Sequence, residues 1–275
     1  MNNRISVTTI EQCGEKAPLV FRGDVFDAIK KAKQYGYDAL EIHVRDAKTF
    51  DTAGVKKCLA ENGIVISTIV TGQIYVVRKY CLTSPDEQNR KQAMAEMKAY
   101  IDIAAELGAK DGVILGWIRG DRPEGDDGTY DRLLSAAIKE LAEYAGSKGQ
   151  RLLVEVINRY EVNTFNTAQE LLDFINKYNL ENVYIHMDCF HMNIDEADMA
   201  ESIRICGDKM GYLHMADSNR HYPGAGHTDF IPIIKACKEV GYEGSFSLEC
   251  IPIPDSDTSA REGFKAIRAM LDAVK

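Results

Sequence analysis

Short apolar runs alternate with longer segments of helical periodicity along the whole chain. The apolar runs are rich in Val, Ile and Leu and have the length of buried strands, which predicts eight β-strands. They lie at residues 5–10, 39–44, 64–70, 112–117, 152–157, 183–188, 212–217 and 245–250. Runs that are apolar at nearly every position are typical of strands covered on both faces, as in parallel sheets.

A helical pattern follows each predicted strand. These segments cover residues 24–35, 52–61, 86–107, 130–147, 167–178, 199–206, 230–240 and 259–275. A glycine or an asparagine stands shortly after most of them, as is common where a left-handed residue ends a helix.

Eight βα units in sequence predict a closed (β/α)₈ barrel, a TIM barrel of the α/β class, as a single domain over residues 1–275. The alternative is an open doubly wound sheet. That alternative lacks support, because neither GxGxxG nor GxxxxGK[ST] follows the first strand.

Composition and charge narrow the classes of function. The chain has 42 acidic and 33 basic residues, a net charge of −9, which disfavours nucleic-acid binding through a basic face. Its seven cysteines are scattered without a CxxC pair, which fits reduced thiols in the cytoplasm. No apolar run approaches the roughly 20 residues that span a membrane, and the first residues do not resemble a signal peptide. We therefore expect a cytoplasmic protein without a membrane or nucleic-acid partner.

Candidate metal ligands stand at the ends of the last four predicted strands. They are Glu155, Asp188, His214 and Glu249. The carboxyl ends of barrel strands meet at one mouth, where three carboxylates and an imidazole would repel each other without a cation. Oxygen ligands with one histidine suit Mn²⁺, Mg²⁺ or Co²⁺. Taken singly, Asp188 could also be a helix cap and His214 a hydrogen-bonded core residue.

Four motifs around these positions carry a family resemblance: EVINRYEVN, HMDCFHMNI, HMADSNRHYPGAGH and SLEC. They resemble the ketose 3-epimerases of the xylose-isomerase-like barrel superfamily, which include D-tagatose and D-psicose 3-epimerases. FRGDVFDAIKKAKQYGYDALEIHVRD and TGQIY in the front half are more similar to the 5-keto-L-gluconate epimerase branch. The resemblance implies one divalent metal on the four ligands, with Glu155 and Glu249 also carrying the proton.

The resemblance also implies substrate contacts and an assembly. It places hydrogen-bonding partners of the substrate at Glu161, His191 and Arg220, and an apolar wall at Trp117. Plainer alternatives are solvated charges, a loop histidine bonded to backbone, and a core tryptophan. Residues 216–218 read Ala-Asp-Ser where the hexulose 3-epimerases have Gly-Glu-Ala, which leaves the hexulose substrate open. A homodimer or homotetramer is expected.

These expectations combine into a metal-dependent 3-epimerase of a ketose or keto-sugar acid. The reaction would pass through a cis-enediolate, with two glutamates as acid and base on opposite faces. The main alternative is an aldose–ketose or hydroxypyruvate-type isomerase that uses the same metal site. A DNA-repair endonuclease of the related barrel would need more histidines than six and a basic face, and a non-catalytic sugar-binding barrel is the last alternative.

Arginines concentrate on the mouth side of the predicted barrel. Seven stand in or beside loops that follow strands: Arg22, Arg45, Arg78, Arg119, Arg122, Arg159 and Arg220. The planar guanidinium suits carboxylate and phosphate, so the asymmetry favours a keto-sugar acid or a sugar phosphate over a neutral sugar. The alternative is that long loops carry solvated charges.

Overall fold

The computed structural model describes residues 3–275, and its strands form one parallel sheet that closes on itself. The strands are β1 (Ile5–Ile10), β2 (Phe21–Arg22), β3 (Ala39–His43), β4 (Val65–Val70), β5 (Gly112–Leu115), β6 (Leu152–Glu155), β7 (Val183–Asp188), β8 (Met210–Met215) and β9 (Phe246–Leu248). Pairing of β1 with β9 closes the ring, with Ile5 opposite Phe246 and Val7 opposite Leu248. The predicted (β/α)₈ barrel is therefore confirmed, and the open sheet is excluded.

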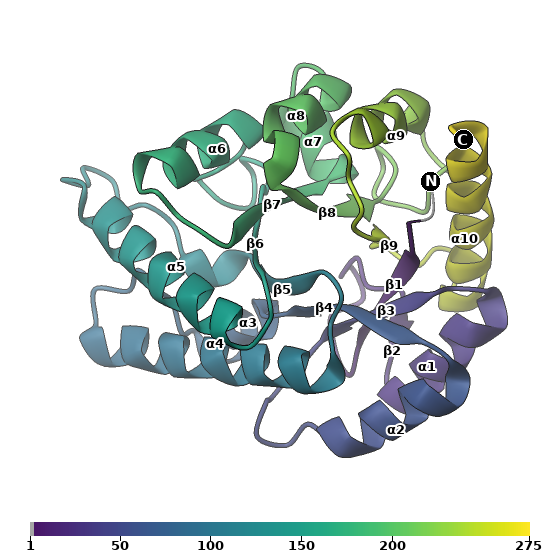
Figure 1. Ribbon diagram of the computed structural model, residues 1–275, viewed down its shortest axis with the longest axis horizontal. Coiled ribbons are helices and arrows are strands. Elements are labelled where there is room, and N and C mark those ends of the chain that lie inside the picture. Colours follow the sequence, from purple (N-terminus) through teal and green to yellow (C-terminus); the bar gives the residue numbers. More distant parts are fainter. Residues whose placement is uncertain (1–2) are drawn as a thin grey trace.

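Helices surround the barrel on all sides (Figure 1). They are α1 (Val25–Tyr35), α2 (Thr52–Asn62), α3 (Gly72–Arg78), α4 (Glu87–Leu107), α5 (Thr129–Ser147), α6 (Ala168–Lys177), α7 (Cys189–Asp195), α8 (Met199–Cys206), α9 (Phe230–Glu239) and α10 (Ser256–Ala273), with 3₁₀ turns η1 (Trp117–Arg119) and η2 (Gly207–Lys209). Among residues 3–275, no helix combines the length and the apolar character that a membrane crossing requires.

Local capping explains where the helices begin and end. The Asp24 carboxylate accepts a hydrogen bond from the Phe26 amide at the start of α1, and Gly36 ends that helix at φ 92°. The last helix begins at Ser256, three residues before its predicted start, because Asp255 caps it through the Thr258 amide. The sequence pattern located this helix but not its cap.

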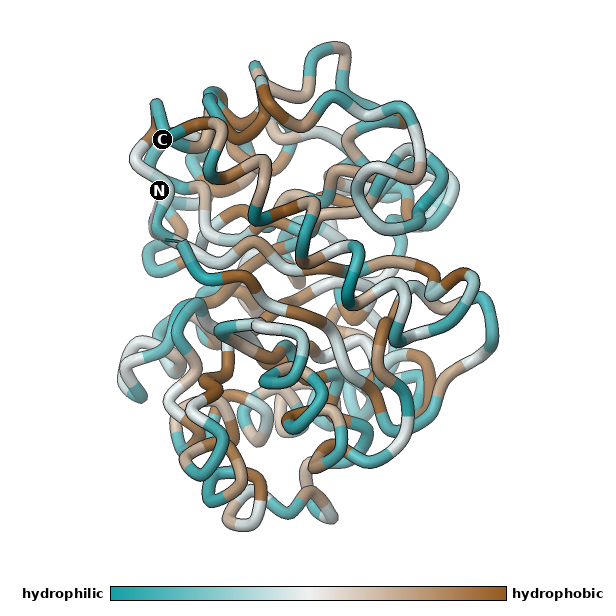
Figure 2. The backbone as a smooth tube through the Cα atoms, turned by 90° about the vertical axis from the view of Figure 1, so that its right-hand side faces the viewer, coloured by the Kyte–Doolittle hydropathy of each residue, from teal (hydrophilic) through white to brown (hydrophobic). Residues whose placement is uncertain are grey.

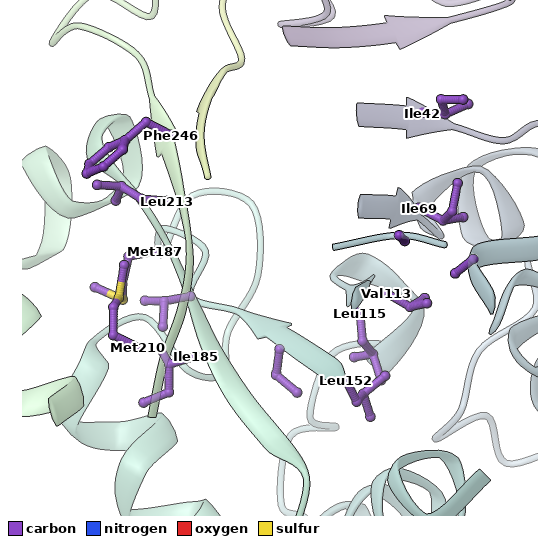
Figure 3. Close-up of a cluster of buried hydrophobic side chains, with 14 of the residues drawn as sticks. Ile42, Ile69, Val113, Leu115, Leu152, Ile185, Met187, Met210, Leu213 and Phe246 are labelled. Atoms are coloured by element: carbon purple, nitrogen blue, oxygen red, sulfur yellow. The ribbon is translucent and has the colours of Figure 1, made fainter. Parts of the chain in front are cut away.

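The main core lies between the strands and the helices. Many strand side chains point outward from the barrel and are fully buried, among them Leu115, Met187, Leu213 and Phe246 (Figure 3). Hydrophobic residues concentrate along the central strands, whereas the outer loops and helix ends are largely hydrophilic (Figure 2). Burying one such side chain contributes about 1.5–3 kcal/mol, so this layer provides the rigid frame for the mouth.

Short elements interrupt the regular alternation on the mouth side. Strand β2 pairs only with β1, α3 lies between β4 and α4 where no helix was predicted, and α7 follows β7 without a break. Strands expected to reach 117, 157, 217 and 250 end two residues earlier, because the chain turns there into loops or η1. Residues of α3, η1 and α7 line a cavity at the mouth of the barrel.

Candidate active site

A cavity of about 630 Å³ opens at the carboxyl ends of the strands. Seven of the eight predicted site residues line it: Trp117, Glu155, Glu161, His191, His214, Arg220 and Glu249. The eighth, Asp188, lies behind this surface with a side chain that is 0% exposed. The fold thus gathers residues that are more than 130 positions apart in sequence at one site.

The four predicted metal ligands form a ligand cluster: Glu155, Asp188, His214 and Glu249. The first three end or nearly end their strands, and Glu249 directly follows β9. Nδ1 of His214 is 3.4 Å from Glu249 Oε2 and 3.8 Å from Asp188 Oδ2. Ligand atoms of Glu155 and His214 lie within 4.8 Å of each other. His214 is therefore the centre around which the three carboxylates gather.

Two buried atoms of this cluster have no hydrogen-bond partner among the described residues: Oδ2 of Asp188 and Nδ1 of His214. Leaving such atoms unpaired costs about 1–3 kcal/mol each. Burial, together with the negative charge of Glu249, raises the pKa of Glu155 to about 8. A divalent cation would satisfy both atoms and offset the repulsion between the carboxylates, so the donor set fits a hard or borderline metal.

Neighbouring charges also shift the pKa values of His214 and Asp188. Burial by itself would lower the pKa of His214, but the carboxylates of Glu41 and Glu249 raise it well above its usual value. Burial opposes ionisation of Asp188, yet the nearby His191 and His214 lower its pKa. The imidazole and the carboxylates therefore compensate each other in the protein without metal.

His191 lies on helix α7, so it is not the loop histidine that the sequence left open as an alternative. The helix begins directly after β7 because Asp188 caps it, accepting a hydrogen bond from the Phe190 amide. Nδ1 of His191 accepts a hydrogen bond of 2.7 Å from the Asn158 amide group, so Nε2 carries the proton. That Nε2 is 3.7 Å from Asp188 and 3.9 Å from Glu155, which leaves it available as a donor at the cavity.

Arg220 reaches the cavity from the loop between β8 and α9. Its Nη1 donates to Glu161 Oε1 at 2.9 Å, and its Nη2 is 3.7 Å from Glu249 Oε2. The loop is organised by Asp217, whose side chain accepts hydrogen bonds from the amides of Ser218, Gly224 and Thr228. The departure from the family pattern at residues 216–218 thus places a structural anchor at the base of this loop.

Glu161 and Trp117 line the cavity, the first as a charged hydrogen-bond acceptor and the second as an apolar surface. Glu161 Oε1 accepts from Arg220 and also from Asn158 Nδ2 at 3.1 Å, so this carboxylate orients two side chains of the site. Trp117 lies on η1 and is 38% exposed, which identifies it as a cavity wall rather than a core residue.

Most of the seven arginines have structural partners. Arg22, Arg78, Arg119, Arg122 and Arg159 bind backbone carbonyls or carboxylates outside the cavity. Arg45 and Arg220 line the cavity, and Lys16 does so as well. No carboxylate lies within 4.0 Å of the Arg45 or Lys16 charge in residues 3–275, so the cavity contains two cations without acidic partners.

Four residues in or beside the site were not predicted from the sequence: Glu41, His43, Asn158 and His186. The first two stand two positions apart on one strand, and this spacing places them on the same face. His186 is fully buried beside the His214 ring, with ring centroids 4.2 Å apart, and neither of its nitrogens has a hydrogen-bond partner in the described part of the chain. A polar residue at alternate positions of a buried strand was the available signal for all but Asn158.

Comparisons with known proteins identify the family of this chain. The family model described as xylose isomerase-like TIM barrel matches residues 29–270. An L-ribulose 3-epimerase of Methylomonas sp. (strain DH-1) is 35% identical over 233 residues, which are 81% of this chain and 77% of that protein. A D-psicose 3-epimerase of Ruminiclostridium cellulolyticum is 32% identical over 231 residues, covering 80% and 76%.

Solved structures of epimerases share the fold. The crystal structure of D-allulose 3-epimerase from Methylomonas sp. in complex with D-allulose superposes with a TM-score of 0.84 at 28% identity, covering 98% of this chain and 97% of that one. The chain therefore belongs to the xylose isomerase-like TIM barrel family. Within this family it is a sugar epimerase of the ketose 3-epimerase group. The nearer likeness to the 5-keto-L-gluconate branch stays a prediction.

Proposed function

We propose that this sugar epimerase inverts C3 of a ketose or keto-sugar acid with the help of one divalent metal, Mn²⁺, Mg²⁺ or Co²⁺. The observation that carries the proposal is the pair of buried, unpartnered atoms, Asp188 Oδ2 and His214 Nδ1, between Glu155 and Glu249. A bound divalent ion supplies Lewis acidity, which stabilises the negative charge that develops on substrate oxygen.

Glu155 and Glu249 are assigned the proton transfer. Removing a proton from one face of C3 and returning one to the other face requires a group on each side, and these glutamates enter the cavity from β6 and from the end of β9. The pKa of about 8 for Glu155 in the metal-free protein shows an environment that favours its protonated form. The substrate would pass through a cis-enediolate between the two carboxyl groups.

The remaining cavity residues are assigned to binding. His191 Nε2 would donate to a substrate oxygen, because Asn158 fixes its proton on that nitrogen. Arg220 would orient a hydroxyl group while Glu161 holds its guanidinium. Trp117 would cover the apolar edge of the sugar.

Substitution of the two glutamates tests the assignment. We expect Glu155→Gln and Glu249→Gln each to lower kcat at least about 10³-fold, with Mn²⁺ present and sugar binding retained. The control is Glu96→Gln, a buried glutamate on α4 that does not line the cavity. Turnover by either cavity variant within tenfold of the unmutated protein would remove the proton-transfer role.

An isomerase with the same ligands is the alternative, and isotope exchange separates the two. In heavy water, epimerisation introduces deuterium at C3 of the ketose, whereas aldose–ketose isomerisation introduces it at C1. NMR of recovered substrate and product distinguishes the positions. Exchange at C1 alone would replace the epimerase proposal by the isomerase.

The charge of the substrate is tested at Arg45. Because Arg45 and Lys16 line the cavity without acidic partners, we propose a keto-sugar acid over a neutral ketose. Arg45→Met should raise KM for keto-sugar acids about tenfold and leave KM for neutral ketoses unchanged. Arg122→Met is the control, because Arg122 pairs with Asp126 and Asp131 away from the cavity. Equal effects on both substrate classes would refute the acid preference.

We further propose a cytoplasmic homodimer or homotetramer. Large apolar side chains are exposed beside the mouth, at Val76, Val77, Trp117 and, at 82% exposure, Tyr160. Apolar side chains that are exposed together often mark a surface where proteins meet. Light scattering coupled to gel filtration measures the assembly, and a monomer at micromolar concentration would overturn this part.

A further inference from the structure

Glu41 on β3 is a carboxylate that does not reach the cavity yet lies at the centre of the barrel interior. It is 0% exposed, and four side chains surround it. His43 Nε2 is 3.1 Å from its Oε1, and His214 Nε2 is 3.0 Å from its Oε2. Tyr212 donates to Oε2 at 2.7 Å and Ser247 at 3.0 Å. A buried carboxylate is stable only with such donors.

The bond to His214 determines which nitrogen faces the ligand cluster. Glu41 accepts from Nε2–H, so Nε2 keeps its proton and Nδ1 is the nitrogen that would offer a lone pair to a cation. Nδ1 is the atom that lies near Asp188 and Glu249 and lacks a partner. A carboxylate behind a ligating imidazole commonly fixes its tautomer and orientation.

The bond to His43 has the same effect on a second ring. His43 stands two residues after Glu41 on the same face of β3, lines the cavity, and has a side chain that is 10% exposed. Its Nε2 donates to Glu41 and lies 3.8 Å from Glu249 Oε1. Its Nδ1 makes no hydrogen bond within residues 3–275, which leaves an acceptor for a hydroxyl group in the cavity.

We propose that Glu41 is a positioning residue that orients two imidazoles at once, His214 in the ligand cluster and His43 in the cavity wall. His43 then determines specificity by accepting a hydrogen bond from a substrate hydroxyl. The inference rests on the proposed function, because it takes the ligand of the cluster to be a divalent cation and the occupant of the cavity to be a sugar.

Binding of Mn²⁺ alone to the chelator-treated chain tests the first half. Isothermal titration calorimetry should show affinity lowered about 10- to 100-fold in Glu41→Gln, because Gln cannot accept from both imidazoles and both hydroxyls. The matched control is Asp111→Asn, a carboxylate of similar burial that accepts from Ser245 at the other end of the barrel. Its Mn²⁺ affinity should stay within twofold of the unmutated chain.

Kinetics of His43 variants test the second half. His43→Leu should raise KM for the sugar about tenfold and leave Mn²⁺ affinity within twofold, whereas His43→Gln, which keeps an acceptor, should recover part of the loss. If His43 only supported the fold, KM would not rise in His43→Leu and fall again in His43→Gln. Glu41→Gln should show both defects, weaker Mn²⁺ binding and raised KM.

The two measurements test the roles of Glu41 and His43 separately. Mn²⁺ affinity of Glu41→Gln within twofold of the unmutated chain overturns the positioning role, and an unchanged KM in His43→Leu overturns the specificity role; both leave the proposed function intact. Failure of the unmutated chain to bind any of Mn²⁺, Mg²⁺ and Co²⁺, or to convert any ketose or keto-sugar acid, overturns the proposed function instead. If Glu41→Gln does not fold, Glu41→Asp, which withdraws the charge by one methylene, provides the same comparison.

Discussion

A single methyl group at Gly116 should displace the catalytic carboxylate without unfolding the barrel. Gly116 directly follows β5, and a β-carbon there would lie 2.8 Å from Glu155 Oε2. Ordinary contacts begin at about 3.4 Å, so the carboxylate would have to move about 0.6 Å. The contact is with the end of a flexible side chain, and the fold can therefore accommodate it.

The magnitude follows from how sharply catalysis depends on position. Catalytic groups must be held within about 0.5 Å, and an error of about 1 Å lowers rates about 10²-fold. We expect Gly116→Ala to lower kcat about 10- to 100-fold, equivalent to about 1.4–2.7 kcal/mol of activation free energy. The unfolding free energy should change by less than about 1 kcal/mol.

Steady-state kinetics with Mn²⁺ and urea unfolding together measure this prediction. Gly146→Ala on α5 is the control, because its β-carbon would meet only the Asn182 side chain, at 3.3 Å. Its kcat should remain within twofold. If Gly116→Ala also retains kcat within twofold, the position of Glu155 does not limit the reaction and the reasoning fails.

Three further predictions concern stability and binding. Burial beside Glu249 raises the pKa of Glu155 in the metal-free native state from 4.5 to about 8. Between these pH values the native state holds a proton that the unfolded state has released, so the free energy of unfolding should fall as pH rises from about 4.5 to about 8. Glu155→Gln should make the unfolding free energy less dependent on pH, by up to about 1.4 kcal/mol per pH unit, the limit for one proton. Urea unfolding at several pH values measures this dependence, and an unchanged dependence contradicts the raised pKa of Glu155. Arg119→Met should lower the unfolding free energy by about 2–4 kcal/mol, because the buried guanidinium donates to the carbonyls of Glu155 and Thr164; a loss below about 1 kcal/mol in urea melts would contradict it. Trp117→Ala should raise KM about fivefold with kcat nearly unchanged, the equivalent of about 1 kcal/mol of apolar contact, and an unaltered KM would exclude Trp117 from the substrate wall.

The barrel and the ligand cluster were accessible from the sequence for a physical reason. Apolar period and length identify strands and helices locally, and eight βα units leave a closed barrel as the solution that covers every strand. In such a barrel the carboxyl ends of the strands converge, so strand-end residues can be grouped without coordinates. This is why Glu155, Asp188, His214 and Glu249 were placed at one site.

Contacts across the barrel were decided only by the tertiary structure. Glu41 lies 173 residues from His214, and no local pattern shows that the two side chains meet inside the barrel. The tautomer of His191 depends on Asn158 from a neighbouring loop, and its helical position on α7 depends on the cap by Asp188. The arginines likewise look equivalent in sequence, but packing pairs most of them with carboxylates or carbonyls, whereas Arg45 lines the cavity and donates to Gln12 rather than to an acidic group. Sequence determines which groups reach the mouth, whereas the closure of the barrel determines which of them are partners, because hydrogen bonds and ion pairs depend on distances that only the folded chain sets.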